Sequence, residues 1–268
     1  MLFNAQNGTV KLGSDEMDYV CFGEGPKVLI MLPGLGDALR KIKGTALPFA
    51  ATYHKHAKGY KVYMFSRRSE LPQGYTTRDM ARDQAEAMQR LGILKADIMG
   101  VSQGGMIAQY LAIDYPELIN KLVLVVTTPK SNNTLQNVVQ SWIEMVQRDD
   151  YRSFMMDTAK KSYSMKYLQK HRFLLSSLGK VGKPKNYTRF LIQANACLNH
   201  DAYQELEKIT CPTFVIGGDR DQIVGPHSSD ILAEKIANCK LHICEGLGHA
   251  CYEEADDFFK RVLEFLRA

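Results

Sequence analysis

Residues 98–112 of the 268-residue chain read IMGVSQGGMIAQYLA, with Ser102 among three glycines. A short apolar run, typical of a buried strand, leads into Ser102, and a run with helical spacing leaves it. Gly100 and Gly104 flank Ser102 at two positions on either side, where a tight turn leaves no room for a Cβ atom. This G-x-S-x-G pattern predicts a serine raised above a sheet on a strained strand-to-helix turn. The alternative is an ordinary turn in which Ser102 only caps the helix.

Apolar runs of strand length recur along the chain and alternate with segments of helical pattern. Strands are expected at 27–34, 61–66, 96–100, 121–126, 211–219 and 240–246. A helix is expected between the second and third strands, with Thr77 as its cap and Gly92 as its end, and two more over 228–237 and 255–267. The alternation predicts an α/β fold with a parallel sheet. The apolar residues of these runs are consecutive and do not alternate with polar ones, which indicates strands that are buried on both faces of the sheet.

A different pattern fills residues 129–204, where helical segments follow one another without a strand. We therefore expect an α/β core over 1–128 and 205–268, with 129–204 inserted as a helical lid. From residue 130 to 204 the chain has twelve Lys and Arg against five Asp and Glu, although the whole chain carries only +5. Solvated helix faces explain such a composition; attraction of acidic substrates or of a membrane surface is the alternative.

Composition limits the other possibilities. With 45% hydrophobic and 24% charged residues, the chain is typical of a globular protein with one sizeable core. No apolar run reaches the roughly 18 residues of a membrane span, and no secretory signal is recognised at the start, which favours a cytoplasmic protein. The six cysteines form no C-x-x-C pair and are expected to be free, mostly buried thiols.

Binding motifs for cofactors are also missing from the sequence. The histidines and cysteines lack metal-ligand spacing, so no metal is expected. No G-x-G-x-x-G opening occurs, so no dinucleotide cofactor is expected. Basic and aromatic residues are not interleaved as in nucleic-acid modules, so no nucleic-acid partner is expected. The oligomeric state is left open.

A serine hydroxyl needs a base before it can attack a carbonyl group. Of the seven histidines, His249 is the best candidate, because it follows the last expected strand in the glycine-rich loop EGLGHACYEE. Sites in open α/β sheets form at the carboxyl ends of strands. The base in turn needs a carboxylate, and both Asp219 and Asp221 follow the strand TFVIGG. A helix or turn cap is the alternative role for each of these residues.

Two backbone N–H groups are expected to bind the negative oxygen that develops during attack. One belongs to Gln103, directly after Ser102. The other belongs to Leu35 in the loop LPGLGD, in which Gly34 and Gly36 free the backbone. An ordinary glycine-rich turn is the alternative reading of that loop.

Together these pieces resemble the α/β-hydrolase fold superfamily, and especially its lidded esterase, lipase and enol-lactonase-like members. The resemblance rests on LPGLGD, GVSQGG, GGDRDQIV and GLGHA, and on the chain order serine, acid, histidine. It implies a mostly parallel central sheet with helices on both faces. In the family the acid is commonly the last residue of G-x-x-D, which favours Asp221 over Asp219. Two positions depart: Pro33 stands where a histidine is frequent, and the loop SRRSELPQGYT lacks the usual glycines, so Arg68 is expected to hold it.

The resemblance implies a serine hydrolase that cleaves carboxylic esters, or thioesters or lactones, through Ser102, His249 and Asp221. The same residues would also serve acyl transfer, peptide cleavage, C–C bond cleavage or perhydrolysis, and a non-catalytic ligand sensor is a further alternative. Methionines and aromatic residues of the lid are expected either to line a hydrophobic acyl pocket or to pack between lid and core. They are Met145, Met155, Met156, Met165, Trp142, Phe154, Tyr163, Tyr167 and Phe173.

Overall fold

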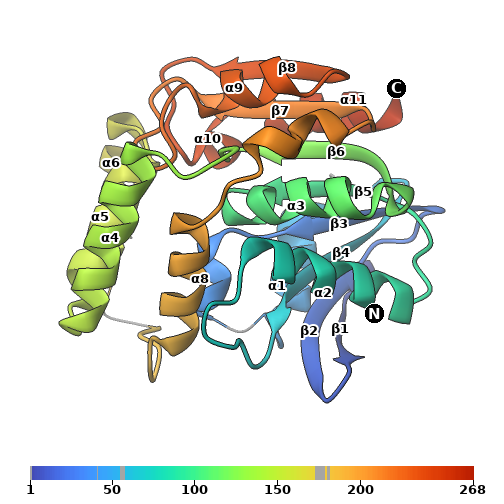
Figure 1. Ribbon diagram of the computed structural model, residues 1–268, viewed down its shortest axis with the longest axis horizontal. Helices are drawn as coiled ribbons and strands as arrows, with labels where there is room; N and C mark the ends of the chain where they lie inside the picture. Colours follow the sequence, from blue (N-terminus) through green and yellow to red (C-terminus); the bar gives the residue numbers. More distant parts are fainter. Residues whose placement is uncertain (1, 41, 55–57, 173–178, 180–181) are drawn as a thin grey trace.

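Eight strands form one twisted sheet in the order β1-β2-β4-β3-β5-β6-β7-β8 (Figure 1). This computed structural model describes residues 2–40, 42–54, 58–172, 179 and 182–268. Strands β3 to β8 pair in parallel, and β1 and β2 add an antiparallel hairpin at the edge next to β4. The strands are β1 (Gln6–Leu12), β2 (Asp15–Phe22), β3 (Lys27–Leu32), β4 (Tyr60–Arg68), β5 (Ala96–Val101), β6 (Ile119–Val125), β7 (Thr213–Gly218) and β8 (Cys239–Cys244).

Helices connect the parallel strands, as the alternating pattern predicts. The α-helices are α1 (Ala46–Tyr53), α2 (Thr77–Arg90), α3 (Gln103–Asp114), α4 (Asn133–Gln147), α5 (Tyr151–Ser162), α6 (Met165–Lys170), α8 (Thr188–Leu198), α9 (Ser228–Lys235), α10 (Cys251–Glu254) and α11 (Phe258–Arg267). Short 3-10 helices are η1 (Leu2–Asn4), η2 (Leu35–Ala38), η4 (Pro116–Leu118) and η5 (Tyr203–Lys208). Within the described residues no helix has both the length and the apolar character needed to cross a bilayer.

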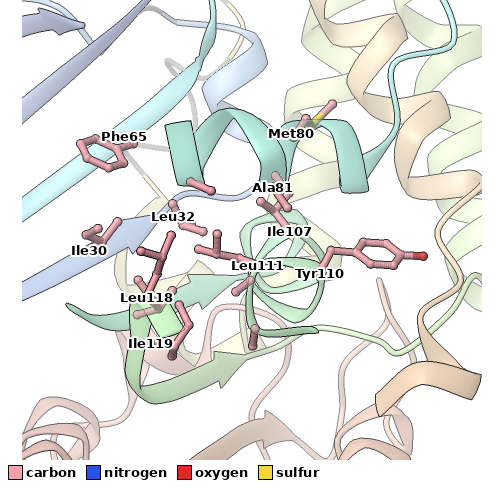
Figure 2. Close-up of a cluster of buried hydrophobic side chains, with 14 of the residues drawn as sticks. Ile30, Leu32, Phe65, Met80, Ala81, Ile107, Tyr110, Leu111, Leu118 and Ile119 are labelled. Carbon is pink, nitrogen blue, oxygen red and sulfur yellow. The ribbon is translucent and has the colours of Figure 1, made fainter. Parts of the chain in front are cut away.

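The sheet is buried on both faces, which confirms the interpretation of its apolar runs. Along β3, Ile30 and Leu32 face a cluster formed with α2 and α3, whereas Leu29 and Met31 face a second cluster formed with α1 and α11. Figure 2 shows the first cluster, with Ile107 of α3 beside Ala81 of α2. Because successive strand residues point to opposite faces, each run must be apolar at every position.

Helix α2 begins at Thr77 itself, so the prediction that Thr77 is the cap is wrong by one residue. The cap is Thr76, whose hydroxyl accepts from the N–H of Asp79 at 3.0 Å, while the Asp79 carboxylate accepts from the N–H of Thr76 at 3.0 Å. The hydroxyl of Thr77 instead lies inside the protein, 2.9 Å from Nδ1 of His200. Gly92 follows the helix with a φ of +68°, as expected for its end.

The insertion between β6 and β7 is helical, as predicted. Figure 1 shows α4, α5 and α6 grouped at one end of the sheet, with α8 between them and the core. An isolated β-bridge joins Lys130 to Asp201, so the chain leaves and re-enters the core at neighbouring points. The insertion therefore stands over the carboxyl end of β6, next to the loop that bears Ser102.

Candidate active site

Ser102 occupies the turn between β5 and α3 in a backbone conformation that side chains rarely adopt. Its φ is 54° and its ψ is −119°, far from both strand and helix values. The flanking glycines are required by the close approach of the chain. A Cβ on Gly104 would lie 2.0 Å from the carbonyl oxygen of Leu32, and a Cβ on Gly100 would lie 2.4 Å from that of Gly104. The sharp turn therefore depends on both glycines.

The structure brings Ser102, His249 and Asp221 into one hydrogen-bonded row. Nε2 of His249 lies 3.0 Å from Oγ of Ser102, and Nδ1 of the same ring lies 2.8 Å from Oδ2 of Asp221. His249 and Asp221 are both buried. The three residues come from loops after β5, β7 and β8, at the carboxyl ends of the strands, where open α/β sheets form their sites.

Asp221 rather than Asp219 faces the histidine. Its other oxygen, Oδ1, accepts from the N–H of Ile223 at 2.8 Å and from that of Val224 at 3.0 Å. Asp219 has a different task, because its Oδ1 accepts from the N–H of Gly246 at 2.7 Å and so ties the loop after β7 to the turn after β8. The two acids thus have separate structural environments.

The loop LPGLGD lies directly beside Ser102. A Cβ on Gly34 would be 3.2 Å from Cβ of Ser102. Leu35 begins η2 and Gln103 begins α3, so neither backbone N–H has an acceptor within its own helix. The Gly34 carbonyl points toward Asp37 and accepts from its N–H at 3.2 Å. Because the C=O and N–H groups of a trans peptide point in opposite directions, the Leu35 N–H points away from Asp37.

A cavity of about 720 Å³ opens over Ser102 and His249. The insertion contributes apolar walls from α4, α5 and α8, and the core contributes residues of η2 and α1. The apolar lining from the insertion is Leu135, Val139, Trp142, Phe154, Met155, Ala159 and Phe190. Among the described residues of the lining, the acidic and basic side chains besides the His249 imidazole are Asp37 and the exposed Arg40. The surroundings of Ser102 are therefore largely apolar.

Cys197 of α8 also lines this cavity. Burial raises the pKa of its thiol to about 12, so the thiol stays protonated at neutral pH. A protonated thiol is a poor nucleophile, so Cys197 is a poor candidate for a reactive group. All six cysteines are unpaired, and four of them are buried, as the sequence predicts.

Comparison with known proteins identifies the family. A family profile described as the α/β hydrolase fold matches residues 27–256. The chain belongs to the α/β hydrolase fold family. A 2-hydroxy-6-oxononadienedioate/2-hydroxy-6-oxononatrienedioate hydrolase of Pseudomonas sp is 26% identical over 261 residues, which cover 91% of this chain and 89% of the relative.

Solved structures of α/β hydrolases superimpose on nearly the whole chain. An α/β hydrolase enzyme from a Medee basin deep-sea metagenome library, MGS-M2, has a TM-score of 0.88 and 20% identity, covering 97% of this chain and 98% of that one. The enol-lactonase of Burkholderia xenovorans LB400 has a TM-score of 0.81 and 21% identity, covering 97% of this chain and 100% of that one. These similarities establish a shared fold.

The predicted lid residues of this α/β hydrolase divide into two groups. Trp142, Phe154, Met155 and Tyr163 line the cavity, whereas the lining does not include Met145, Met156, Met165 or Tyr167. Phe173 lies outside the described residues. Spacing along a helix indicates which side is buried, but it does not distinguish a cavity wall from a packing contact.

Sequence reasoning missed two arginines near the site. Arg67 is fully buried behind the loop LPGLGD, and Arg189 of α8 pairs with Asp37 at 3.2 Å. Arg68, which was expected to hold the loop after β4, contacts Tyr75 of that loop at 3.3 Å and Asp15 at 3.1 Å. The basic pair at 67–68 was the available signal, but nothing in the sequence shows that one arginine points inward and the other toward the hairpin.

Proposed function

We propose that this α/β hydrolase cleaves carboxylic esters, with Ser102 as nucleophile, His249 as general base and Asp221 as the carboxylate that orients it. The observation that carries the proposal is the row of two hydrogen bonds, at 3.0 and 2.8 Å, from Ser102 through His249 to Asp221. A serine becomes an effective nucleophile only when a base takes its proton, and the base needs a partner for its second nitrogen.

The reaction would proceed in two halves. Ser102 Oγ attacks the ester carbonyl carbon as its proton passes to Nε2 of His249, and the imidazolium is stabilised by Asp221. The proton then moves to the leaving alcohol, which departs and leaves an acyl group on Ser102. Water gives a proton to His249 and attacks this acyl-enzyme, and the carboxylic acid is released.

The N–H groups of Leu35 and Gln103 are proposed to bind the oxyanion of both tetrahedral intermediates. Both groups begin helices that border Ser102. Each such donor stabilises the transition state by about 3 kcal/mol in serine hydrolases. Gly34 allows this loop to approach Ser102, because a larger residue would press on the Ser102 side chain.

The cavity supports an uncharged substrate with a hydrophobic acyl part. Its walls near the insertion are aliphatic and aromatic, and Asp37 in its lining is already paired with Arg189. The name of the Pseudomonas relative describes a dicarboxylate substrate, which would need cationic partners in the cavity. Arg40 is the one arginine or lysine among the described lining residues, and it is exposed. A simple ester, or a lactone as in the structurally similar enol-lactonase, therefore fits better.

We further propose that residues 129–204 act as a cap that covers the acyl group and excludes water. The proposal is supported by the bridge between Lys130 and Asp201 near the two ends of this segment. The apolar side chains of α4, α5 and α8 over Ser102 also support it. Excluding water strengthens the electrostatic interactions that bind the oxyanion.

Pre-steady-state hydrolysis of p-nitrophenyl esters tests the proposal. We expect a burst of about one nitrophenolate per protein molecule, followed by slower turnover, because the alcohol leaves before the acyl-enzyme is hydrolysed. Ser102→Ala should abolish both phases. Adding a primary alcohol and analysing the products separates hydrolysis, which gives only the acid, from acyl transfer, which gives a new ester. Turnover without a burst and unaffected by Ser102→Ala would exclude the proposed mechanism.

A further inference from the structure

The guanidinium of Arg67 lies buried behind the two candidate oxyanion donors. Its Nη2 donates to the carbonyl oxygen of Pro33 at 2.6 Å and to Oε1 of Gln103 at 3.2 Å. Arg67 is 2% exposed, and burial lowers the pKa of its guanidinium. Burying a charged side chain costs free energy unless the charge is paired and hydrogen-bonded. If residue 67 served only to pack the end of β4, an apolar side chain would stabilise the fold better than arginine.

The side chain of Gln103 is held from two directions. Its Oε1 accepts from Arg67, and its Nε2 donates to the carbonyl of Gln193 at 2.9 Å and to Sγ of Cys197 at 3.3 Å. Gln103 is 1% exposed, so it has little freedom to move. Gln103, whose backbone N–H is one of the two candidate oxyanion donors, is thereby fixed through its side chain to β4 and to α8 of the insertion.

The loop that carries the Leu35 N–H is held on both sides by the end of β4. Before Leu35, the carbonyl of Pro33 is bound by Arg67. After Leu35, the carboxylate of Asp37 accepts from the hydroxyl of Ser66 at 2.8 Å and from the backbone N–H of Arg67 at 3.3 Å. Arg189 of α8 adds a contact to the same carboxylate at 3.2 Å. One network therefore reaches the segments of both donors.

We propose that Arg67 and the Gln103 side chain are positioning residues that fix the Leu35 and Gln103 N–H groups for the oxyanion and connect that site to α8. This inference rests on the proposed function, because the two donors matter only if an oxyanion forms at Ser102. A misplacement of catalytic groups by about 1 Å can lower a rate roughly 100-fold. Neither Arg67 nor Gln103 is among the residues that line the cavity over Ser102, so their loss should lower kcat and leave KM nearly unchanged.

A matched control separates positioning from ordinary packing. Gln109 is also on α3, is 0% exposed and donates from Nε2 to the carbonyl of Thr128 at 3.1 Å. Gln109→Met removes a buried amide from the same helix, away from both donors. We expect Gln103→Met and Gln109→Met to lower the melting temperature by similar amounts, but only Gln103→Met to lower kcat.

The experiment measures kcat and KM for a p-nitrophenyl ester and the inhibition constant of an alkyl trifluoromethyl ketone, which binds serine hydrolases as a tetrahedral adduct. The variants are Arg67→Met, Arg67→Lys, Gln103→Met, the double variant Arg67→Met/Gln103→Met, and Gln109→Met. Because residues that act as one unit give non-additive losses, the double variant should lose no more than the worse single variant. Each single Met variant should lose about 10- to 100-fold in kcat and a similar factor in ketone affinity. Arg67→Lys, which keeps one donor, should recover part of the loss.

Three results would overturn the inference. The first is a kcat of Gln103→Met and of Arg67→Met within twofold of the wild type. The second is a kcat loss in the double variant equal to the product of the two single losses. The third is a kcat loss in Gln109→Met as large as that in Gln103→Met. If Arg67→Met does not fold, Gln103→Met and Arg67→Lys still decide the matter. A wild-type protein that shows no ester turnover and no ketone binding would refute the proposed function itself, which is a different outcome from active variants.

Discussion

His249 Nδ1 lies 2.8 Å from one carboxylate oxygen of Asp221, while the other oxygen of Asp221 is bound by two backbone N–H groups. The carboxylate is therefore held rigidly by its own loop and meets the imidazole in a single orientation. This arrangement favours the His249 tautomer with its proton on Nδ1, which is the tautomer that the proposed role of Nε2 as base requires.

Replacing Asp221 by Asn should destroy this orientation while preserving the shape of the loop. We expect kcat/KM for a p-nitrophenyl ester to fall about 1,000- to 10,000-fold, because the amide favours the wrong tautomer of His249. Asp219→Asn is the control: Asp219 binds the Gly246 N–H rather than His249 and its loss should change kcat/KM less than about threefold. Equal losses in both variants would contradict the assigned role of Asp221.

Gly104→Ala should strongly destabilise the protein. The new Cβ would lie 2.0 Å from the Leu32 carbonyl oxygen, which belongs to a central strand and cannot move aside. We expect a loss of about 3 kcal/mol or more and a fall in melting temperature of roughly 10 °C. Gly36→Ala is the matched control, because nothing lies within 4 Å of its Cβ position. Calorimetry of both variants checks the prediction; an unchanged melting temperature of Gly104→Ala would show that the turn is not as tight as described.

The parts of the fold predicted correctly are those in which local sequence and final environment agree. The strand before Ser102 and the helix after it are buried on all sides, so their apolar patterns are unambiguous. The strands of the β1–β2 hairpin are not predicted from the sequence. The edge strand β1 is half-exposed and carries polar residues such as Asn7 and Lys11. Edge strands lack the continuous apolar run that marks a buried strand.

The candidate site could be predicted from residue types that suggest the chemistry, as for Ser102 and His249, whose Oγ and Nε2 atoms lie 3.0 Å apart in the structure. The hydrogen-bond network around Gln103 could not be predicted, because the sequence suggests a role only for the backbone N–H of Gln103 and none for its side chain. Its side chain contacts residues 36 positions before it and 94 positions after it in sequence. Long-range contacts of this kind leave no periodic signal in the chain.

His200 should make the protein sensitive to acid. Burial against α2 and α3 lowers the pKa of this imidazole to about 3, below its ordinary value of 6.5. The unfolded chain therefore binds a proton that the folded chain does not bind between these pH values, and stability falls as the pH drops from 6.5 toward 3.

His200→Asn removes the titrating group and keeps a polar atom near Thr77. Between pH 6.5 and 4.5 we expect the wild type to lose about 2 kcal/mol more free energy of unfolding than this variant. Urea unfolding at a series of pH values measures the difference. The control is His227→Asn, which removes a histidine whose side chain is 87% exposed. Parallel pH profiles for the wild type and His200→Asn would contradict the prediction.

Trp142 should limit the size of the acyl group. It lines the cavity from α4 and is held by a hydrogen bond from Nε1 to Asp157 at 2.8 Å. Trp142→Leu enlarges the cavity, so the ratio of kcat/KM for p-nitrophenyl octanoate to that for the butyrate should rise about tenfold. Met145→Leu alters the same helix outside the lining and should leave the ratio unchanged. A lower ratio in Trp142→Leu would show that the acyl group lies elsewhere.

The most direct test of the central claim is covalent labelling by a fluorophosphonate, followed by mass spectrometry of the proteolytic peptides. Oγ of Ser102 lies 3.0 Å from Nε2 of His249, the proposed base. The reagent should therefore label one serine per protein molecule, and that serine should be Ser102. Ser102→Ala should be unlabelled and inactive toward esters, and Asp221→Asn should label much more slowly. Absence of the phosphonyl group from Ser102, together with full ester turnover by Ser102→Ala, would contradict the account.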